Sequence, residues 1–174
     1  AFPQTIIAME LGSRVWRQRA GGPAPFVLAE VVAIGAGEAT VQDLEGDAPA
    51  EVPPALDELM PVHTGPPVEN NCQLTHLSAA TLLDNLLLRY QQEQVYTFTG
   101  SILTSINPCK RLPGVDSADA MLACVGKPLG GAAPHLYGLA EEAYRVMLRE
   151  GRHKALVVSG VSGAGKTEAN KRLM

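Results

Sequence analysis

The stretch GVSGAGKT at residues 160–167 constrains the fold of this chain more than any other feature. It fits the pattern G-x-x-x-x-G-K-[ST] at every position. The apolar run KALVVSG precedes it without any polar alternation, which predicts a strand at 155–159 buried on both faces. The residues after it favour a helix. Strand, glycine-rich loop and helix in this order predict an α/β fold whose loop curls around a phosphate group.

The residue types of this loop suit a nucleoside triphosphate. Glycines let successive backbone N–H groups point inward at phosphate oxygens, and the following helix adds the positive end of its dipole. Lys166 is expected to reach the β- and γ-phosphates, and the Thr167 hydroxyl to coordinate Mg²⁺. Both are therefore the predicted catalytic residues. The predicted nucleotide-binding residues of the loop are Gly160, Val161, Ser162, Gly163, Ala164, Gly165, Lys166 and Thr167.

The loop alone does not distinguish ATP from GTP. A glycine-rich turn that matches by chance is the alternative, and the flanking strand and helix patterns argue against it. Beyond the loop, Glu168 suits the first turn of a helix, while Lys171 and Arg172 are interpreted as a solvated basic face.

The composition is that of a globular protein, with 46% hydrophobic and 18% charged residues among 174. A formal net charge of −4 gives no overall field that attracts nucleic acid or an anionic membrane, so neither is an expected partner. No apolar run is long enough for direct membrane insertion. The first residues, AFPQTIIAM, lack the features of a signal peptide and begin with Ala, so we expect the natural N-terminus upstream.

The cysteines and histidines do not suggest a metal or disulfide site. Cys72, Cys109 and Cys124 are odd in number and widely spaced, which favours reduced thiols in a cytosolic protein. The four histidines show no metal-ligand spacing.

The N-terminal third has the pattern of short strands. SRVWRQR, PFVLAEVVAIG and EATVQDLEG are rich in β-forming residues, and Gly35–Gly37 predicts a hairpin turn. Several short strands in residues 11–62 predict a small barrel. Residues 48–67 are rich in proline and predict the end of this barrel and a linker; the prolines are Pro49, Pro53, Pro54, Pro61, Pro66 and Pro67.

The pattern changes to helical spacing from Ser78, the predicted N-cap. The expected apolar stripe of this helix, interpreted as core packing, is Leu82, Leu83, Leu86, Leu87 and Tyr90. VYTFTG and SILTSINP then predict two strands that meet at Gly100, the second ending at Pro108. A short helix is expected around 118–124.

A longer helix is predicted from Pro134, placed in its first turn, to Gly151, placed at its end. Glu141 and Arg145 form a favourable i,i+4 pair on it. Its apolar stripe comprises Leu136, Leu139, Ala140, Ala143, Val146 and Met147.

These segments together resemble the motor (head) domain of the myosins. VVSGVSGAGKTEANKRLM resembles the family's phosphate-binding segment, and VYTFTGSILTSINP, followed by RLPGVD, resembles the strands that lead to its Asn-Pro adenine motif. PHLYGLAEEAYRVML and LTHLSAATLLDNLLLRY resemble two helices of the motor core. GSRVWRQR resembles the start of the SH3-like barrel ahead of many myosin motors. The spacing is most similar to unconventional, class XI-like myosins of plants and algae.

The resemblance implies a fold and a set of ligands. It implies a small all-β SH3-like barrel with a Pro-rich linker at 1–65, and at 66–174 the first part of an α/β P-loop NTPase motor core. It implies ATP and Mg²⁺ as cofactors, with Asn107, Pro108 and Arg111 near the adenine. The implied function is an actin-based motor ATPase, with actin filaments as partner, a lever that binds light chains or calmodulin, and a place in the cytoplasm with the cytoskeletal myosin complex.

The chain also departs from the family's pattern. Val161 stands where the family usually has Glu, and Asp116 stands where an aromatic residue often lies against the base. The family's two switch segments, NxxSSRFGK and DxxGFE, do not occur in the 174 residues. We therefore expect a fragment that is inactive by itself, from an active motor or, as the alternative, from a nucleotide-binding scaffold without a motor cycle. Kinesins share the loop pattern, but the Asn-Pro strand and the Pro-His helix have no counterpart in them.

Overall fold

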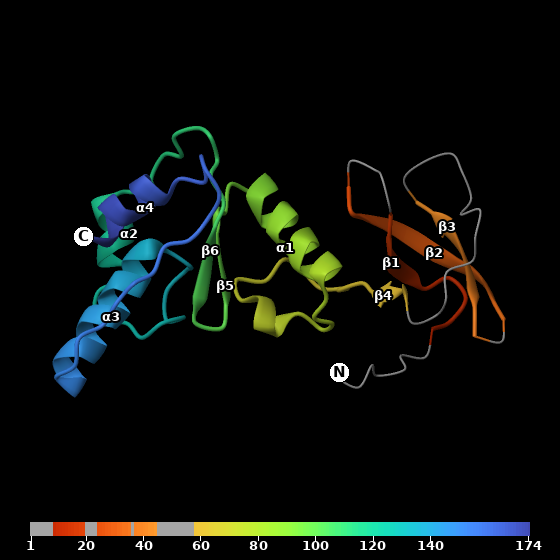
Figure 1. Cartoon of the computed structure of the whole chain (residues 1–174), viewed down its shortest axis with the longest axis horizontal. Coiled ribbons are helices and arrows are strands. Elements are labelled where there is room, and N and C mark those ends of the chain that lie inside the picture. Colours follow the sequence, from red (N-terminus) through yellow and green to blue (C-terminus); the bar gives the residue numbers. More distant parts are fainter. Residues whose placement is uncertain (1–8, 20–23, 36, 45–57) are drawn as a thin grey trace. The chain divides into compact units, whose positions relative to one another are not determined.

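The structure, a computed structural model, describes residues 9–19, 24–35, 37–44 and 58–174. These residues belong to two compact units (Figure 1). The first unit contains the chain up to residue 65 together with 75–83, and the second contains 66–74 and 84–174. The sequence-based boundary between residues 65 and 66 remains a prediction.

The first unit is built on a four-stranded antiparallel sheet. Its strands are β1 (Arg14–Gln18), β2 (Phe26–Ile34), β3 (Ala39–Asp43) and β4 (Met60–Pro61), in the order β3-β2-β1-β4. Side chains alternate across the sheet because successive strand residues point to opposite faces. In β3, for example, Ala39, Val41 and Asp43 are buried and the residues between them are exposed. The core of this unit comprises Val15, Ala29, Val31, Ala39, Val41 and Leu59.

The three predicted strands of this region are confirmed, and so is the hairpin turn. Gly37 has a φ of 92°, and the Gly35 N–H donates to the Glu38 carbonyl at 2.8 Å. The described strands form an open sheet, so the predicted closed barrel is not confirmed. Pro49, Pro53 and Pro54 lie outside the described residues. Pro61 belongs to the edge strand β4 rather than to a linker, which a residue without an N–H group allows.

The second unit surrounds a short antiparallel hairpin, β5 (Tyr96–Thr99) and β6 (Ile102–Ser105). The strands meet at Gly100, which has a positive φ of 62°, as predicted. The remaining elements are η2 (Asn71–Gln73), α2 (Ala118–Leu122), α3 (Leu136–Glu150) and α4 (Lys166–Leu173). One buried cluster joins the hairpin to α3 and α4; it comprises Val95, Tyr96, Leu112, Leu136 and Ala169.

Helix α1 (Ala79–Gln91) begins as predicted, because the Ser78 hydroxyl accepts a hydrogen bond from the Thr81 N–H at 3.2 Å. The prediction that its leucine stripe forms the core is wrong. Leu83 is 49% exposed and Leu87 is 54% exposed. Its most buried residues besides Ala80 are polar: Thr81, Asn85 and Arg89.

Hydrogen bonds explain why this polar face is buried. Asn85 accepts from the Val68 N–H at 2.8 Å and donates to the Val68 carbonyl at 3.0 Å and to Asn71 at 2.7 Å. Arg89 donates to the Thr97 hydroxyl and to the Tyr96 carbonyl, both at 2.9 Å. Buried polar groups are tolerated when all of them find partners, so the helix packs through amide and guanidinium groups.

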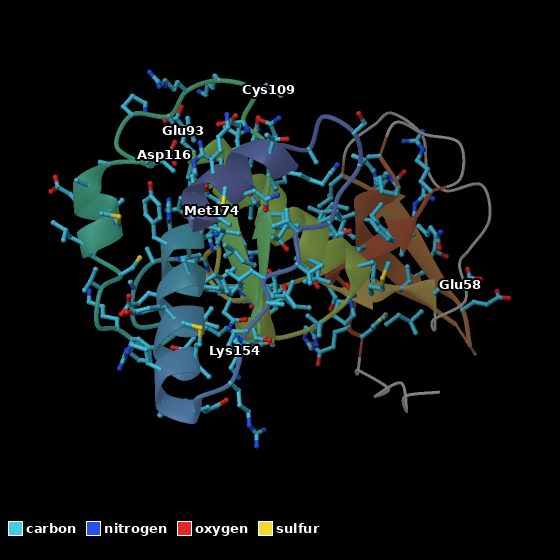
Figure 2. All side chains as sticks on the ribbon, turned by 60° about the vertical axis from the view of Figure 1, so that its left-hand side comes forward. Glu58, Glu93, Cys109, Asp116, Lys154 and Met174 are labelled. Atoms are coloured by element: carbon cyan, nitrogen blue, oxygen red, sulfur yellow. The ribbon has the colours of Figure 1, made fainter. Side chains whose placement is uncertain are left out.

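Helix α3 confirms the predicted end at Gly151, whose φ is 62°, and the Glu141–Arg145 pair, at 4.0 Å. Its N-cap is His135, so Pro134 precedes the helix rather than lying in its first turn. Helix α2, with Ser117 as N-cap, is confirmed. Figure 2 shows Lys154, just beyond α3, at the opposite end of the unit from Cys109 and Asp116.

The predicted buried strand at 155–159 is wrong in this structure. Residues 152–160 have neither helix nor strand pairing, and Val157 is 89% exposed. A strand needs a neighbour for its backbone groups, and no described strand lies beside this segment. Val158 alone packs against the core of the unit. None of the helices in the described part of the chain has the length and apolar character that a bilayer crossing requires.

Candidate nucleotide-binding site

The glycine-rich loop enters α4 through residues with positive φ. Gly163 has a φ of 79° and Gly165, the N-cap of α4, a φ of 93°, values that other residues rarely adopt. The first hydrogen bond of the helix runs from the Ala169 N–H to the Gly165 carbonyl at 2.9 Å. The free N–H groups of the first helical turn therefore face the loop, where they favour an anion.

Lys166 folds back along the loop. Its Nζ donates to the Gly160 and Val161 carbonyls, each at 2.8 Å. The ammonium group thus lies at the start of the loop, within reach of a bound phosphate. Val161 contributes its carbonyl to this arrangement, while its side chain is 79% exposed. Ser162 and Thr167 are also exposed.

Asn107 connects the loop to the segment after β6. Its Nδ2 donates to the Gly163 carbonyl at 2.9 Å, and its Oδ1 accepts from the Cys109 N–H at 2.9 Å. Cys109 itself has a positive φ of 52°, which completes the tight turn around Pro108. The structure therefore brings the predicted Asn-Pro segment directly against the predicted phosphate loop.

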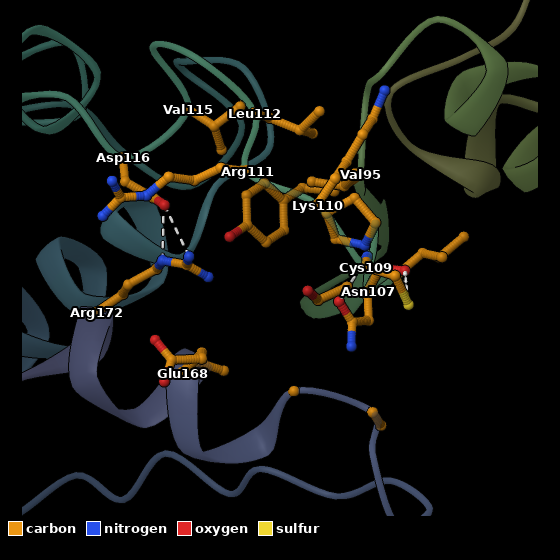
Figure 3. Close-up of a pocket in the computed structure, with 17 residues that line it drawn as sticks. Val95, Asn107, Cys109, Lys110, Arg111, Leu112, Val115, Asp116, Glu168 and Arg172 are labelled. Carbon is orange, nitrogen blue, oxygen red and sulfur yellow. Dashed lines mark hydrogen bonds and ion pairs between the residues drawn. The ribbon is translucent and has the colours of Figure 1, made fainter.

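A cavity of about 550 Å³ opens between these two segments. Asn107, Pro108 and Arg111 line it together with Gly165 and Glu168. Figure 3 shows Glu168 on α4, across the cavity from Asn107. Its apolar floor comprises Val95, Leu112, Val115 and Ala169. The volume lies within the usual range for small-molecule pockets. The cavity thus joins the predicted adenine-binding residues to the end of the glycine-rich loop.

One pair of pocket residues was not expected from the sequence. Arg172 donates from Nε to Asp116 Oδ1 and from Nη2 to Oδ2, both at 2.7 Å. The interpretation of Arg172 as part of a solvated face is therefore wrong, whereas Lys171 pairs with Glu168 on the exposed side of α4. No spacing within α4 identifies this pair, because Asp116 lies 56 residues earlier in the chain.

Buried ionisable groups lie beneath the pocket. Burial raises the pKa of Tyr96, with a smaller opposing effect from Arg172. Burial lowers the pKa of His135, whose ring contacts that of Tyr96 edge-on at 4.7 Å between centroids. Both groups are therefore kept neutral at the inner wall of the site. At the rim, Glu93 raises the pKa of Lys110 through a hydrogen bond.

The described residues contain no cluster of three His, Cys, Asp or Glu side chains that could hold a metal ion. Magnesium does not require one, since it is usually held by one or two protein oxygens, phosphate groups and water. The exposed Thr167 hydroxyl at the start of α4 fits this requirement.

Comparison with known proteins places this sequence in a family. The sequence model of the myosin head (motor domain) matches residues 68–174. Myosin-9 of Arabidopsis thaliana is 36% identical over 99% of this chain and 11% of its own length. Unconventional myosin-VI of Homo sapiens is 34% identical over 94% of the chain and 12% of its own length. The chain thus spans about a tenth of the relatives it matches, and it belongs to the myosin head (motor domain) family.

Proposed function

We propose that this chain forms the ATP-binding part of an actin-based motor. The Asn107–Gly163 hydrogen bond carries the proposal, because it joins a base-sized cavity to a loop suited to phosphate. A nucleotide needs both parts at once, because the cavity receives its base and the loop receives its triphosphate. Membership in the myosin head family supports ATP as the nucleotide.

Each predicted residue then has a role in binding. The backbone N–H groups of Gly160–Gly165 hold the phosphate oxygens, and Lys166 exchanges its carbonyl partners for the β- and γ-phosphates. The Thr167 hydroxyl would supply one oxygen ligand to Mg²⁺, and the ion would offset the negative charge of the phosphates. Asn107, Pro108 and Arg111 surround the adenine. Val161 does not disturb this scheme, because its side chain is exposed and only its carbonyl faces Lys166.

The activity of the whole protein is part of the same proposal. It couples ATP hydrolysis to movement on actin filaments in the cytoplasm, with light chains or calmodulin bound to a lever. Residues 1–65 form an SH3-like barrel ahead of a motor core that starts at 66. Phosphoryl transfer also needs groups that position water and stabilise the γ-phosphate charge, and these are expected from segments outside the 174 residues.

Actin-stimulated ATP hydrolysis by the whole protein tests this function. We expect stimulation in the wild type and its loss in Lys166→Ala. Lys154→Ala is the matched control, since Lys154 is a cation of the same unit that pairs with Glu150 and does not line the cavity. ATP binding without any stimulation by actin would favour the scaffold alternative. Wild-type affinity for ATP in Lys166→Ala would contradict the assignment of the loop.

A further inference from the structure

Asp116 and Arg172 form one wall of the cavity between the Asn-Pro turn and α4. Figure 3 shows the Arg172 side chain rising from α4 towards Asp116, on the side opposite Asn107. The two bonds of 2.7 Å form a parallel pair between guanidinium and carboxylate. This pairing connects parts of the chain that are 56 residues apart.

The geometry of the pair leaves a flat surface available. A bidentate carboxylate occupies the edge of a guanidinium group and fixes its plane, and it does not cover the faces of that plane, which are the surfaces that stack on rings. The side chains of Arg172 and Asp116 are 31% and 39% exposed, and pairs at such exposure contribute little to stability. The effect of the pair is therefore to hold the guanidinium in place at the cavity wall.

The rest of the wall offers one other guanidinium group, that of the exposed Arg111, which no carboxylate among the described residues holds in place. Tyr96 is the one aromatic residue among the described residues that line the cavity, and it is only 5% exposed. The apolar floor of Val95, Leu112 and Val115 gives contact area without a preferred ring orientation. A planar heterocycle in this cavity finds its stacking partner in a guanidinium group, and that of Arg172 is the one held in a fixed plane, by Asp116.

We propose that Arg172 stacks against the purine base of the bound nucleotide and determines base affinity, with Asp116 as the residue that positions it. The inference rests on the proposed function, since it places the triphosphate in the loop at 160–167 and the base in the cavity. It separates two contributions to affinity. Lys166 acts on the phosphates, whereas Arg172 acts on the base.

Titration of the 174-residue chain with ATP and with inorganic tripolyphosphate, which has no base, tests the inference. Arg172→Ala should raise the Kd for ATP roughly tenfold, in the range expected for a lost cation–π contact, and leave tripolyphosphate unchanged. Arg172→Lys, which keeps the charge but lacks the planar guanidinium group, should lose a similar share of its affinity for ATP. Asp116→Asn should show a smaller loss, again for ATP alone. Arg149→Ala is the matched control, because Arg149 is an exposed arginine of α3 outside the cavity.

The outcomes separate this inference from the proposed function. The inference is overturned if Arg172→Ala lowers the affinity for ATP and for tripolyphosphate equally, because Arg172 then acts through its charge alone. Wild-type affinity for ATP in Arg172→Lys would lead to the same conclusion. Unchanged ATP affinity in folded Arg172→Ala would also overturn the inference. The proposed function would still hold in that case if Lys166→Ala lost affinity for both ATP and tripolyphosphate. If the wild-type chain binds neither ligand, the proposed function itself fails. Circular dichroism of each variant verifies that its helices are intact.

Discussion

The side-chain amide of Asn107 donates to the Gly163 carbonyl at 2.9 Å, and through this bond the Asn-Pro turn holds the phosphate loop. The same side chain accepts the Cys109 N–H, so one residue fixes both its own turn and the loop opposite. Together with the buried cluster that joins the hairpin to α4, this residue connects two segments that lie far apart in the chain.

Asn107→Ala should loosen the phosphate loop. A neutral hydrogen bond contributes about 1 kcal/mol, so we expect the affinity for inorganic tripolyphosphate to fall about fivefold. Titration calorimetry measures the change. Asn170→Ala provides the control, since Asn170 is exposed on α4. Unchanged affinity for tripolyphosphate in Asn107→Ala would show that the loop keeps its shape without this bond.

A mutation on the polar face of α1 should destabilise the protein more than a mutation on its leucine face. Arg89→Ala leaves the Tyr96 carbonyl and the Thr97 hydroxyl unpaired in a buried place, and should lower the free energy of unfolding by about 3 kcal/mol. Leu87→Ala, at a position 54% exposed, should change it by less than about 0.5 kcal/mol. Urea denaturation followed by circular dichroism compares them. A larger loss in Leu87→Ala would mean that the leucine face is buried in solution.

Helix α1 also shows where sequence reasoning succeeds and where it fails. Its start at Ser78 depends on a local hydrogen bond, so residue type and spacing suffice to predict it. Its buried face depends on Asn71, Thr97 and the Val68 backbone, partners that periodicity cannot identify. The leucine pattern consequently predicted the wrong face.

In the functional site, too, some features can be predicted from the sequence and others cannot. The loop at 160–167 follows from its glycines and lysine because the required backbone conformation is local. The segment 155–159 was predicted as a strand from its apolar run, but strand formation depends on neighbours that the described chain does not place beside it. The role of Arg172 depends on Asp116, which lies 56 residues earlier, so a reading of α4 by itself assigns it to solvent.

The Arg17–Asp43 pair should make the stability of the small sheet depend on pH in the acid range. Arg17 Nε donates to Asp43 Oδ1 at 2.6 Å, and this bond lowers the pKa of a carboxyl that is 6% exposed. A lowered pKa in the folded state adds stability above the unfolded pKa near 3.8, and this is lost as pH falls through the folded pKa. Stability should therefore drop in this acid range.

Asp43→Asn should remove this acid dependence. It should also lower the free energy of unfolding at neutral pH by about 2 kcal/mol, because Arg17 loses a charged partner. Fluorescence of Trp16, the single tryptophan of the chain, reports on β1 during urea denaturation. Asp119→Asn, at an exposed position of α2, is the control. The same acid dependence in Asp43→Asn as in the wild type would rule out this pair as its source.

His135 should make the second unit less stable in mild acid. It caps α3 by accepting the Tyr137 N–H at Nδ1, 3.0 Å away, which requires a neutral ring. Burial lowers its pKa, and this effect outweighs the opposing influence of the Val115 backbone and of Asp116. The unfolded state therefore binds a proton near pH 6.5 that the folded state rejects, so stability falls as pH decreases from about 7 to about 5.

His135→Asn separates the cap from the charge, because Asn caps a helix as well but does not titrate. We expect the variant to keep its helices and to lose the slope of unfolding free energy between about pH 7 and about pH 5. Urea denaturation followed by helical circular dichroism at several pH values measures this slope. His153→Asn, at an exposed position after α3, should retain the wild-type slope. Equal slopes in wild type and His135→Asn would mean that the buried imidazole accepts its proton without loss of the cap.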